Sequence, residues 1–480
     1  MTRLRRPGPW DWSPALAEPL WTSAEIVNAT GGRLHGQGFE ASGVSFDTRS
    51  LEPGDLFVAL KGERDGHAFA DEAFRKGAAG ALTTQPVDGP RVEVSDSLVG
   101  LQRLAAAARE RSPARRGAVT GSVGKTSVTQ AVKAGLELAG DAHGSIKSFN
   151  NQIGVPLTLA RMPRNTRRAI FEIGMNHAGE IDPLSRMVRP HAVAVTTVGP
   201  VHIEAFEDGE AGVARAKAEI FAGLQQGGAA ILNADDQWFD LLSSEAVKAG
   251  ARVRSFGVRG KDARLIGFVP RPDGGVVHAV IDGATLDFPI AQSGAHWGPN
   301  SLCVLLMLQA LEVDRSLALD ALADFQPLEG RGSERTLPAG GGEFLLIDES
   351  YNANPISMRA AIATLGARRA EGRRIAVLTD MLELGPDAAS MHAELAKALA
   401  AANVDQVFCA GPLMWNLWDA LPAARRAAYA STAAELAPAV VQSVSPGDVV
   451  MVKGSNGSRA GLVAKALGAL GDPARARGAA

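Results

Sequence analysis

The sequence predicts an α/β protein with three domains. Its 480 residues exceed what one hydrophobic core usually supports, so two or three domains are expected from size alone. Two separate series of short apolar runs alternate with helical patterns, which is typical of parallel sheets covered by helices. We expect three consecutive domains, at residues 1–96, 97–328 and 329–480.

The first domain is predicted to be small and of mixed α/β type. Residues 45–61 form two short strand patterns around a Pro-Gly turn at residues 52–55. The alanine-rich stretch at residues 98–111 predicts a helix that leads through Pro113 to a glycine-rich loop at residues 120–127.

This glycine-rich loop has the residues needed to bind nucleotide phosphates. Gly121 and Gly124 allow backbone N–H groups to converge on an anion, and the following helix presents its positive N-terminal end. Lys125 is expected to meet the β- and γ-phosphates and Thr126 to bind Mg2+. The complete Walker pattern needs a glycine where this chain has Val119, so only its Gly-x-x-Gly-Lys-Thr core is present. The alternative, a glycine turn that merely starts a helix, is weakened by the Lys-Thr pair, and ATP is the expected nucleotide.

The rest of the central domain predicts a parallel sheet with added hairpins. Its apolar runs lie at residues 169–173, 192–196 and 229–232. Between residues 264 and 290, Asp-Gly turns separate short alternating runs, which predicts hairpins joined to the parallel sheet.

The third domain predicts another strand series, at residues 344–347, 375–378, 407–409 and 449–452. Asp348, Asp380 and Lys453 follow three of these strands. Ligands bind outside the carboxyl ends of strands in open α/β sheets, so the three together favour a ligand-facing edge. Either Asp380 or Lys453 alone would be explained as an ordinary loop charge. Residues 348–355 are too polar for a routine turn, although an elaborate N-cap is the alternative.

Composition excludes several other classes of protein. The net charge of -3, without a basic stripe, argues against a nucleic acid partner. Two cysteines, Cys303 and Cys409, rule out a disulfide framework and are expected to be buried free thiols in a reducing compartment. The longest apolar stretch is too short to span a bilayer, and the basic N-terminus lacks the apolar core of a secretory signal. We expect a cytoplasmic protein without membrane insertion.

Four further polar residues each have an ordinary structural interpretation. Glu172, near the end of a strand, is suited to hold the Mg2+ of the phosphate loop, or it is a solvent-facing carboxylate. His202 is a hydrogen-bonded loop histidine by default, and Lys217 a solvated helix lysine. Asn300 precedes an apolar helix, so helix capping explains it as well as a nucleotide role does.

Taken in order, these segments resemble the Mur ligase superfamily over nearly the whole chain, and the shortened phosphate loop is the form this superfamily carries. The landmarks are residues 45–49, 120–127, 150–151, 154–156, 172–176, 202, 217, 296–300, 330–331, 351–355, 380–385 and 453–455. The chain has a Tyr-Asn-Ala-Asn-Pro run and lacks the Asp-Asn-Pro-Arg motif of the members that add the third amino acid. It is therefore most similar to the members that add D-Ala-D-Ala to UDP-N-acetylmuramoyl-tripeptide (UDP-MurNAc-tripeptide) in peptidoglycan precursor synthesis.

The resemblance implies a role for each domain. The first would hold the UDP end of the substrate, the central domain would bind ATP, and the third would be Rossmann-like. The implied substrate-binding residues are Ser45, Asp47, Thr48, Arg49, Lys61, Gly62, Asn150, Asn151, Tyr351, Asn352, Asn354, Asp380, Glu383 and Lys453. The implied ATP-binding residues are Gly121, Ser122, Val123, Gly124, Lys125, Thr126, Ser127, His296, Asn300, Arg331 and Asp348, the last of which would meet the ribose.

The resemblance also implies the catalytic groups. Lys125, Glu172, His202 and Lys217 would be catalytic, and the last three would bind magnesium together with Thr126. Lys217 matches a lysine that relatives carry as a carbamate, which converts a cation into a metal-binding anion.

Two positions depart from the superfamily pattern. Trp297 stands where many relatives have asparagine after the histidine of the adenine-binding motif, which leaves the adenine contacts open. Ala460 stands where a methionine is common after the Lys-Gly-Ser loop.

The implied reaction is an ATP-dependent amide ligation through an acyl phosphate, with ATP and Mg2+ as cofactors and a monomer as the default state. A folylpolyglutamate synthetase would share the ATP site but lack the UDP-binding first domain, which the segment at residues 45–62 argues against. A nucleotide-switched binding protein would leave the polar edge of the third domain unexplained. A kinase is disfavoured because no catalytic base motif is present.

Overall fold

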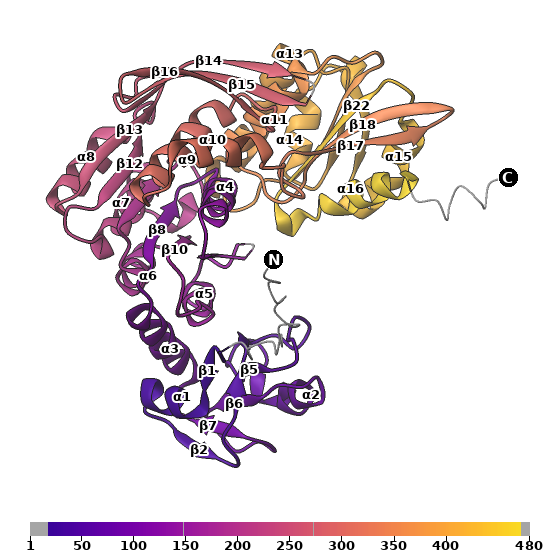
Figure 1. Cartoon of the computed structure of the whole chain (residues 1–480). Helices are drawn as coiled ribbons and strands as arrows, with labels where there is room; N and C mark the ends of the chain where they lie inside the picture. Colours follow the sequence, from indigo (N-terminus) through magenta and orange to yellow (C-terminus); the bar gives the residue numbers. More distant parts are fainter. Residues whose placement is uncertain (1–17, 147, 272, 472–480) are drawn as a thin grey trace, which may run out of the picture. The chain divides into compact units, whose positions relative to one another are not determined.

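A computed structural model describes residues 18–146, 148–271 and 273–471 of the chain (Figure 1). The chain divides into two compact units. Unit 1 comprises Met1–Ser112 and Leu159–Arg164, and unit 2 comprises Pro113–Thr158 and Asn165–Ala480.

Unit 1 contains a five-stranded sheet in the order β2-β7-β6-β5-β4. The strands are β2 (Arg33–His35), β4 (Gly43–Ser45), β5 (Asp55–Val58), β6 (Gly80–Thr83) and β7 (Arg91–Glu93). Pairing is parallel from β4 to β7, and β2 is antiparallel to β7. Of the two strands expected within residues 45–61, β5 is confirmed, whereas β4 overlaps this range only at Ser45.

Helices and a short ribbon complete unit 1. They are β1 (Trp21–Thr22), α1 (Ser23–Thr30), β3 (Glu40–Ala41), α2 (Ala70–Arg75) and α3 (Ser97–Arg111), with β1 antiparallel to β3. α3 confirms the helix predicted at residues 98–111. It begins where it does because the Asp96 side chain accepts hydrogen bonds from the backbone N–H groups of Leu98 and Val99.

Unit 2 contains two separate sheets, of which the larger has nine strands. Its order is β16-β15-β14-β13-β12-β11-β8-β10-β9. The strands are β8 (Arg115–Thr120), β9 (Ala142–Gly144), β10 (Arg168–Glu172), β11 (Ala192–Val195), β12 (Ala229–Asn233), β13 (Arg252–Gly257), β14 (Ala263–Arg271), β15 (Gly274–Ile281) and β16 (Ala284–Ile290). Pairing is parallel from β9 to β14 and antiparallel from β14 to β16. The predicted parallel sheet with added hairpins is confirmed.

Helices cover this sheet on both faces. On one face lie α4 (Lys125–Leu138), α9 (Trp297–Ala310) and α10 (Arg315–Asp324), which pack together beside the sheet (Figure 1). α6 (Ile181–Val188) packs against β8, and α8 (Phe239–Lys248) packs against β12 and β13 and contacts α7 (Glu210–Ala218). In β11, Ala192 and Ala194 join the core under α4 and α9, whereas Val193 and Val195 are buried outside that cluster, as the strand period of two requires.

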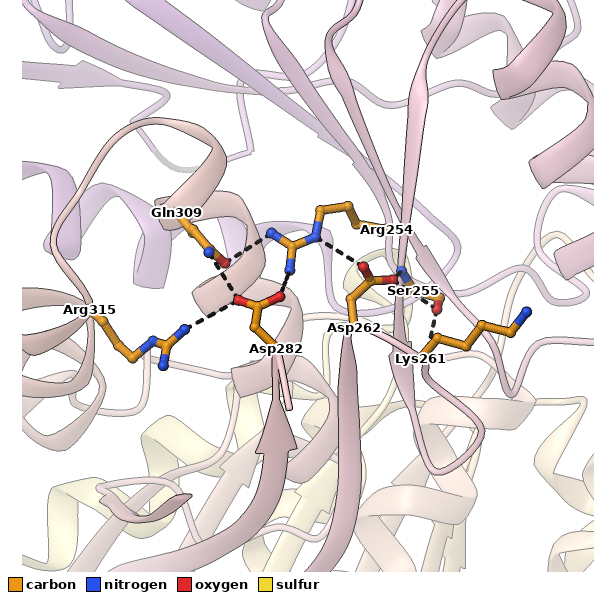
Figure 2. Close-up of polar contacts among 7 residues, drawn as sticks. All are labelled: Arg254, Ser255, Lys261, Asp262, Asp282, Gln309 and Arg315. Carbon is orange, nitrogen blue, oxygen red and sulfur yellow. Dashed lines mark hydrogen bonds and ion pairs between the residues drawn. The ribbon is translucent and has the colours of Figure 1, made fainter. Parts of the chain in front are cut away.

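A polar network fixes the place where the parallel sheet gives way to the hairpins (Figure 2). Arg254 in β13 pairs with Asp262, which precedes β14, and with Asp282 in the β15–β16 turn. The carboxylate of Asp282 also accepts hydrogen bonds at 3.0 Å from Gln309 in α9 and at 3.2 Å from Arg315 in α10. The network therefore joins the hairpin turn to two helices on one face of the sheet.

The smaller sheet of unit 2 has six strands in the order β17-β18-β22-β19-β20-β21. The strands are β17 (Ser333–Ala339), β18 (Gly342–Glu349), β19 (Arg374–Thr379), β20 (Gln406–Ala410), β21 (Arg426–Ala430) and β22 (Val449–Lys453). All pairs are parallel except β17 with β18. The helices are α11 (Pro355–Ala367), α12 (Ala388–Ala393), α13 (Leu395–Ala401), α14 (Met414–Ala420), α15 (Ala433–Ser443) and α16 (Gly461–Gly468).

Two cores lie on opposite faces of this six-stranded sheet. In β22, Met451 joins a cluster with residues of α11 and α13, whereas Val450 and Val452 join a cluster with residues of α15 and α16. Because β18, β19, β20 and β22 are buried on both faces, each contains a continuous apolar run, which is why the four predicted strands are confirmed.

Two predicted positions shift slightly. Asp348 and Lys453 were expected just past their strands, but they lie within the ends of β18 and β22. The strand pairing continues through them, with Asp348 opposite Val452 and Glu349 opposite Lys453. Asp380 directly follows β19, as expected.

The cysteines are buried and free, as predicted, and burial raises the pKa of the Cys409 thiol to about 12. Across residues 18–146, 148–271 and 273–471, no helix combines the length and the apolar character needed to cross a membrane.

Candidate active site

The phosphate loop joins β8 to α4 and leaves the N-terminus of α4 open. Gly121 and Gly124 adopt φ values of +148° and +87°, and no side chain caps the helix. A Cβ on Gly121 would lie 2.0 Å from Thr196 Oγ1, so only glycine fits there. The backbone N–H of Ser122 donates to Thr197 O at 2.6 Å, which ties the loop to the residues after β11. The loop therefore has the form that an anion site requires.

Lys125, the first residue of α4, is enclosed by this loop. Its Nζ donates to Gly121 O at 2.5 Å. Burial lowers the pKa of the Lys125 amine, and the nearby charge of Glu172 opposes this shift only in part. The Lys125 amine is therefore held inside the loop, at the N-terminus of α4.

Glu172 ends β10 as a buried carboxylate, only 1% exposed. Asn150 Nδ2 donates to its Oε1 at 2.7 Å. Its Oε2 is buried and has no hydrogen-bond partner among the described residues. The alternative of a solvent-facing carboxylate is therefore wrong, and the unpartnered oxygen suits a cation.

Lys217 in α7 is likewise buried, at 2% exposure. Burial, and then the charge of Lys125, lower the pKa of the Lys217 amine well below its ordinary value. The default interpretation of a solvated helix lysine is wrong, because α7 turns this position inward. A neutral amine is the form that reacts with carbon dioxide to give a carbamate.

His202 lies on the loop after β11 and is held by Glu383. Its Nδ1 lies 2.5 Å from Glu383 Oε2. Burial lowers the pKa of the His202 imidazole, which outweighs the opposing effect of Glu383. This shift favours the neutral ring, which is the form in which imidazole binds a metal.

A cavity of about 420 Å3 unites most of the predicted site residues of unit 2. It is lined by Ser122, Val123, Gly124, Lys125, Thr126, Ser127, Asn150, Glu172, His202, His296, Asn300, Arg331, Tyr351, Asn352, Asn354 and Lys453, among others. A second cavity, of about 1480 Å3, shares Thr126, Arg331 and Tyr351 with the first and is lined by Asp348. Gly121, Asn151, Lys217, Asp380 and Glu383 line neither cavity.

Ser148 and Glu349 were missed by sequence reasoning. Tyr351 Oη donates to Ser148 Oγ at 2.9 Å, and Thr126 Oγ1 and Arg331 Nη2 each lie 3.4 Å from the same oxygen. Lys453 Nζ lies 3.3 Å from Glu349 Oε2 and donates to Asn352 O at 3.0 Å. The available signals were weak: Ser148 stands two positions before Asn150, and Glu349 lies within the polar run at residues 348–355.

Several predicted ligand-binding residues have structural contacts of their own. Asn354 is the N-cap of α11 and forms a capping box with Ser357, so the N-cap interpretation of this segment is confirmed for that residue. Asn151 Oδ1 accepts hydrogen bonds from the backbone N–H groups of Ile153 and Gly154. Asp380 accepts from the backbone N–H of Met414 at 2.8 Å, and burial raises the pKa of its carboxyl.

In the adenine-motif segment at residues 296–300, the structure contradicts the capping interpretation of Asn300. Asn300 does not cap α9, whose N-cap is His296 without a side-chain hydrogen bond, so the capping explanation is wrong. Its amide instead lies near the phosphate loop, 3.5 Å from where a Cβ of Gly124 would be. Burial lowers the pKa of the His296 imidazole, whose Nδ1 is buried without a partner among the described residues. Trp297 is buried and its ring centroid lies 5.8 Å from that of Phe325, so it is a core residue.

The predicted residues of unit 1 lie at the end of β4 and in the loops after β4 and β5. Ser45 is buried, and its Oγ accepts a hydrogen bond at 3.3 Å from the backbone N–H of Asp47. Asp47 pairs with Arg49, whose side chain is 86% exposed. Thr48 O accepts from Lys76 Nζ at 2.7 Å. The remaining two, Lys61 and Gly62, make backbone contacts with Asp65 and Arg64, respectively.

Comparison with known proteins places the chain in a family. The family model described as Mur ligase middle domain matches residues 119–308, and that described as Mur ligase, glutamate ligase domain matches residues 337–456. The "UDP-N-acetylmuramoyl-tripeptide--D-alanyl-D-alanine ligase" of Escherichia coli (strain K12) is 35% identical, over 81% of this chain and 86% of the relative. The protein of the same name from Rickettsia prowazekii (strain Madrid E) is 30% identical, over 91% of this chain and 97% of the relative.

A solved structure agrees with these relatives. A crystal structure of MurF from Acinetobacter baumannii aligns with a TM-score of 0.82 and 27% identity, covering 94% of this chain and 99% of that chain. The chain therefore belongs to the Mur ligase family, together with the UDP-N-acetylmuramoyl-tripeptide D-alanyl-D-alanine ligases.

Proposed function

We propose that this protein is the ATP-dependent, ADP-forming ligase that joins D-Ala-D-Ala to UDP-MurNAc-tripeptide, giving UDP-MurNAc-pentapeptide, ADP and phosphate for peptidoglycan synthesis. The relatives named for this reaction span most of the chain, as given above. The observation that carries the proposal is the cavity that the phosphate loop, Glu172 and His202 line together with Asn352, after β18, and Lys453, at the end of β22. A site of this kind can hold a nucleotide beside a second, polar substrate.

The chemistry follows from the poor reactivity of a carboxylate toward an amine. The terminal carboxylate of the tripeptide attacks the γ-phosphorus of ATP, which forms an acyl phosphate and releases ADP. The amine of D-Ala-D-Ala then attacks the acyl carbon, and the tetrahedral intermediate expels phosphate while the nitrogen loses its proton. Lys125 stabilises the charge on the transferred phosphoryl group, and closure of the site keeps water from the acyl phosphate.

The residues present fit magnesium. Thr126, Glu172, His202 and carbamylated Lys217 would hold it, since the buried Glu172 Oε2 has no partner among the described residues and Lys217 is buried beside Lys125. When bound, Mg2+ neutralises phosphate charge and stabilises the developing negative charge of the reaction.

The remaining assignments extend the proposal to the whole chain. Residues 1–96 bind the UDP end through Ser45, Asp47, Thr48, Arg49, Lys61 and Gly62, residues 97–328 bind ATP, and residues 329–480 form a Rossmann-like domain. Asn150, Asn151, Tyr351, Asn352, Asn354, Asp380 and Lys453 bind the peptide substrates, whereas Glu383 contacts His202. His296, Asn300 and Arg331 bind the ATP nucleotide, and Asp348 meets its ribose. The protein acts as a cytoplasmic monomer, in keeping with its two free thiols.

Phosphate release tests the function when each component is omitted in turn. The complete mixture contains ATP, MgCl2, UDP-MurNAc-tripeptide and D-Ala-D-Ala, and the product is identified by mass. We expect release that needs both peptide substrates and yields the pentapeptide. Phosphate release without D-Ala-D-Ala, and without a new amide, would instead indicate a binding protein that is switched by its own ATP hydrolysis.

A further inference from the structure

Residues 380–385 form a short loop that carries Glu383 to His202. The loop follows β19, whereas His202 follows β11 of the other sheet. The Glu383 carboxylate is the group that holds His202 Nδ1 at 2.5 Å. Glu383 lines neither cavity, although its side chain is 56% exposed. Its position suits contact with His202 better than contact with a bound substrate.

The loop is anchored at three successive residues. Asp380 Oδ1 accepts from the backbone N–H of Met414 at 2.8 Å. The backbone N–H of Met381 donates to His392 Nε2 at 3.0 Å, and that of Leu382 donates to Ser455 Oγ at 3.0 Å.

His392 is itself fixed in orientation. It is fully buried, and its Nδ1 lies 2.6 Å from Ala388 O, a carbonyl that can only accept a hydrogen bond. Its Nδ1 therefore carries the proton and its Nε2 is free to accept from Met381. Glu383 thus extends from a rigid support.

Both residues of the His202–Glu383 pair have left-handed backbones. The φ values are +52° for His202 and +62° for Glu383, and neither is glycine. Such conformations cost roughly 1–3 kcal/mol each and persist where the surrounding structure holds them.

The contact favours one tautomer of His202. A carboxylate has only acceptor oxygens, so a neutral ring approaches it at 2.5 Å most favourably with its proton on Nδ1. Nε2 is then the nitrogen with the free lone pair, on a residue that lines the cavity with Glu172. Metal-binding histidines commonly donate their other N–H to a carboxylate in this way, which fixes the ring and makes it a better ligand.

We propose that Glu383 is a positioning residue that holds His202 as the Nδ1–H tautomer, ready to bind the metal of the ATP site through Nε2. The proposal rests on the metal site of the proposed function. It assigns Glu383 to His202 and not to the dipeptide substrate.

The test combines ring spectroscopy with metal binding. The 15N shifts of the His202 ring report its tautomer in the protein without ligands. Electron paramagnetic resonance of free Mn2+, with a non-hydrolysable ATP analogue present, reports metal affinity. Glu383→Ala is expected to lose the fixed Nδ1–H tautomer and to bind Mn2+ roughly 10- to 100-fold more weakly. Glu383→Gln keeps an acceptor oxygen, so it should retain the tautomer and bind Mn2+ with intermediate affinity.

Asp287→Asn is the matched control. It alters another exposed histidine–carboxylate pair, in which His278 Nδ1 lies 2.8 Å from Asp287 Oδ1 on the β15–β16 hairpin. This variant should match the wild type in both measurements. Unchanged His202 shifts and unchanged Mn2+ affinity in Glu383→Ala would overturn the proposal. Ligase activity of the wild-type preparation tests the proposed function separately, so the two failures are distinguishable.

Discussion

Glu172→Gln separates metal binding from folding. The substitution keeps the size of a buried side chain and can keep the contact with Asn150, but it removes the negative charge. A buried polar atom without a partner costs roughly 1–3 kcal/mol, and Glu172 Oε2 is such an atom among the described residues. The variant replaces this charged oxygen with an uncharged amide group, which lowers the cost of burial. It also loses the attraction between the carboxylate and Lys125, which opposes that gain. We therefore expect its metal-free stability to change by only about 1 kcal/mol.

The response to magnesium should change much more. At a free concentration of about 100 times Kd, a ligand that binds only the folded state adds about 2.7 kcal/mol. Unit 2 has roughly 360 residues, and an unfolding entropy of about 2.1 cal/mol/K per residue converts this energy to a rise in Tm of about 3 to 4 °C. In Glu172→Gln the rise should fall below about 1 °C, and kcat should fall roughly 100- to 1000-fold.

Thermal unfolding with a non-hydrolysable ATP analogue, with and without MgCl2, measures this difference. Asp448→Asn is the control, because Asp448 is a buried carboxylate next to β22 that lines neither cavity. It should lower Tm but keep the shift caused by magnesium. The reasoning is refuted if Glu172→Gln shows the full wild-type magnesium shift.

Three further predictions follow. Lys217→Met should fold at least as stably as the wild type, because burying an amine is costly. It should nevertheless lose more than about 99% of kcat. Full activity of this variant at saturating Mg2+ would rule out a metal-binding role for Lys217. Gly121→Ala should abolish nucleotide binding in a fluorescence titration, because its Cβ would collide with Thr196, and unchanged affinity would contradict the assigned loop geometry. Burial alone would raise the pKa of the Asp448 carboxyl, but hydrogen bonds from Arg373 and from backbone N–H groups outweigh burial and lower it. The ionised Asp448 carboxylate therefore stabilises the fold by roughly 1–3 kcal/mol above about pH 4, and this stabilisation is lost as the pH falls further. In urea unfolding, Asp448→Asn should be less stable than the wild type near neutral pH but equally stable at low pH.

The strands could be predicted because burial on both faces leaves a local signature. The run at residues 169–173 became β10 and that at residues 192–196 became β11, each within one residue. The hairpins were predicted because Asp-Gly turns mark them directly. Strand ends were less certain at Asp348 and Lys453, where pairing with a neighbouring strand extends the ladder over polar residues.

The site was predictable where its chemistry is local. The phosphate loop needs consecutive residues, so the sequence reveals it. The burial of Lys217 depends on packing with distant segments, and only the resemblance pointed to it. Ser148 and Tyr351 are 203 positions apart, and no local pattern indicates that they meet. The pairing of Glu383 with His202 joins loops of two sheets, so it too was visible only in the structure.

Oxygen transfer tests the acyl phosphate most directly. The terminal carboxylate of UDP-MurNAc-tripeptide is labelled with 18O, the reaction is run with ATP, Mg2+ and D-Ala-D-Ala, and the released phosphate is analysed by mass. Attack of the carboxylate on the γ-phosphorus predicts one 18O atom in each phosphate, with the other label retained in the new amide. Unlabelled phosphate alongside pentapeptide product would contradict the acyl phosphate and the roles assigned to this site.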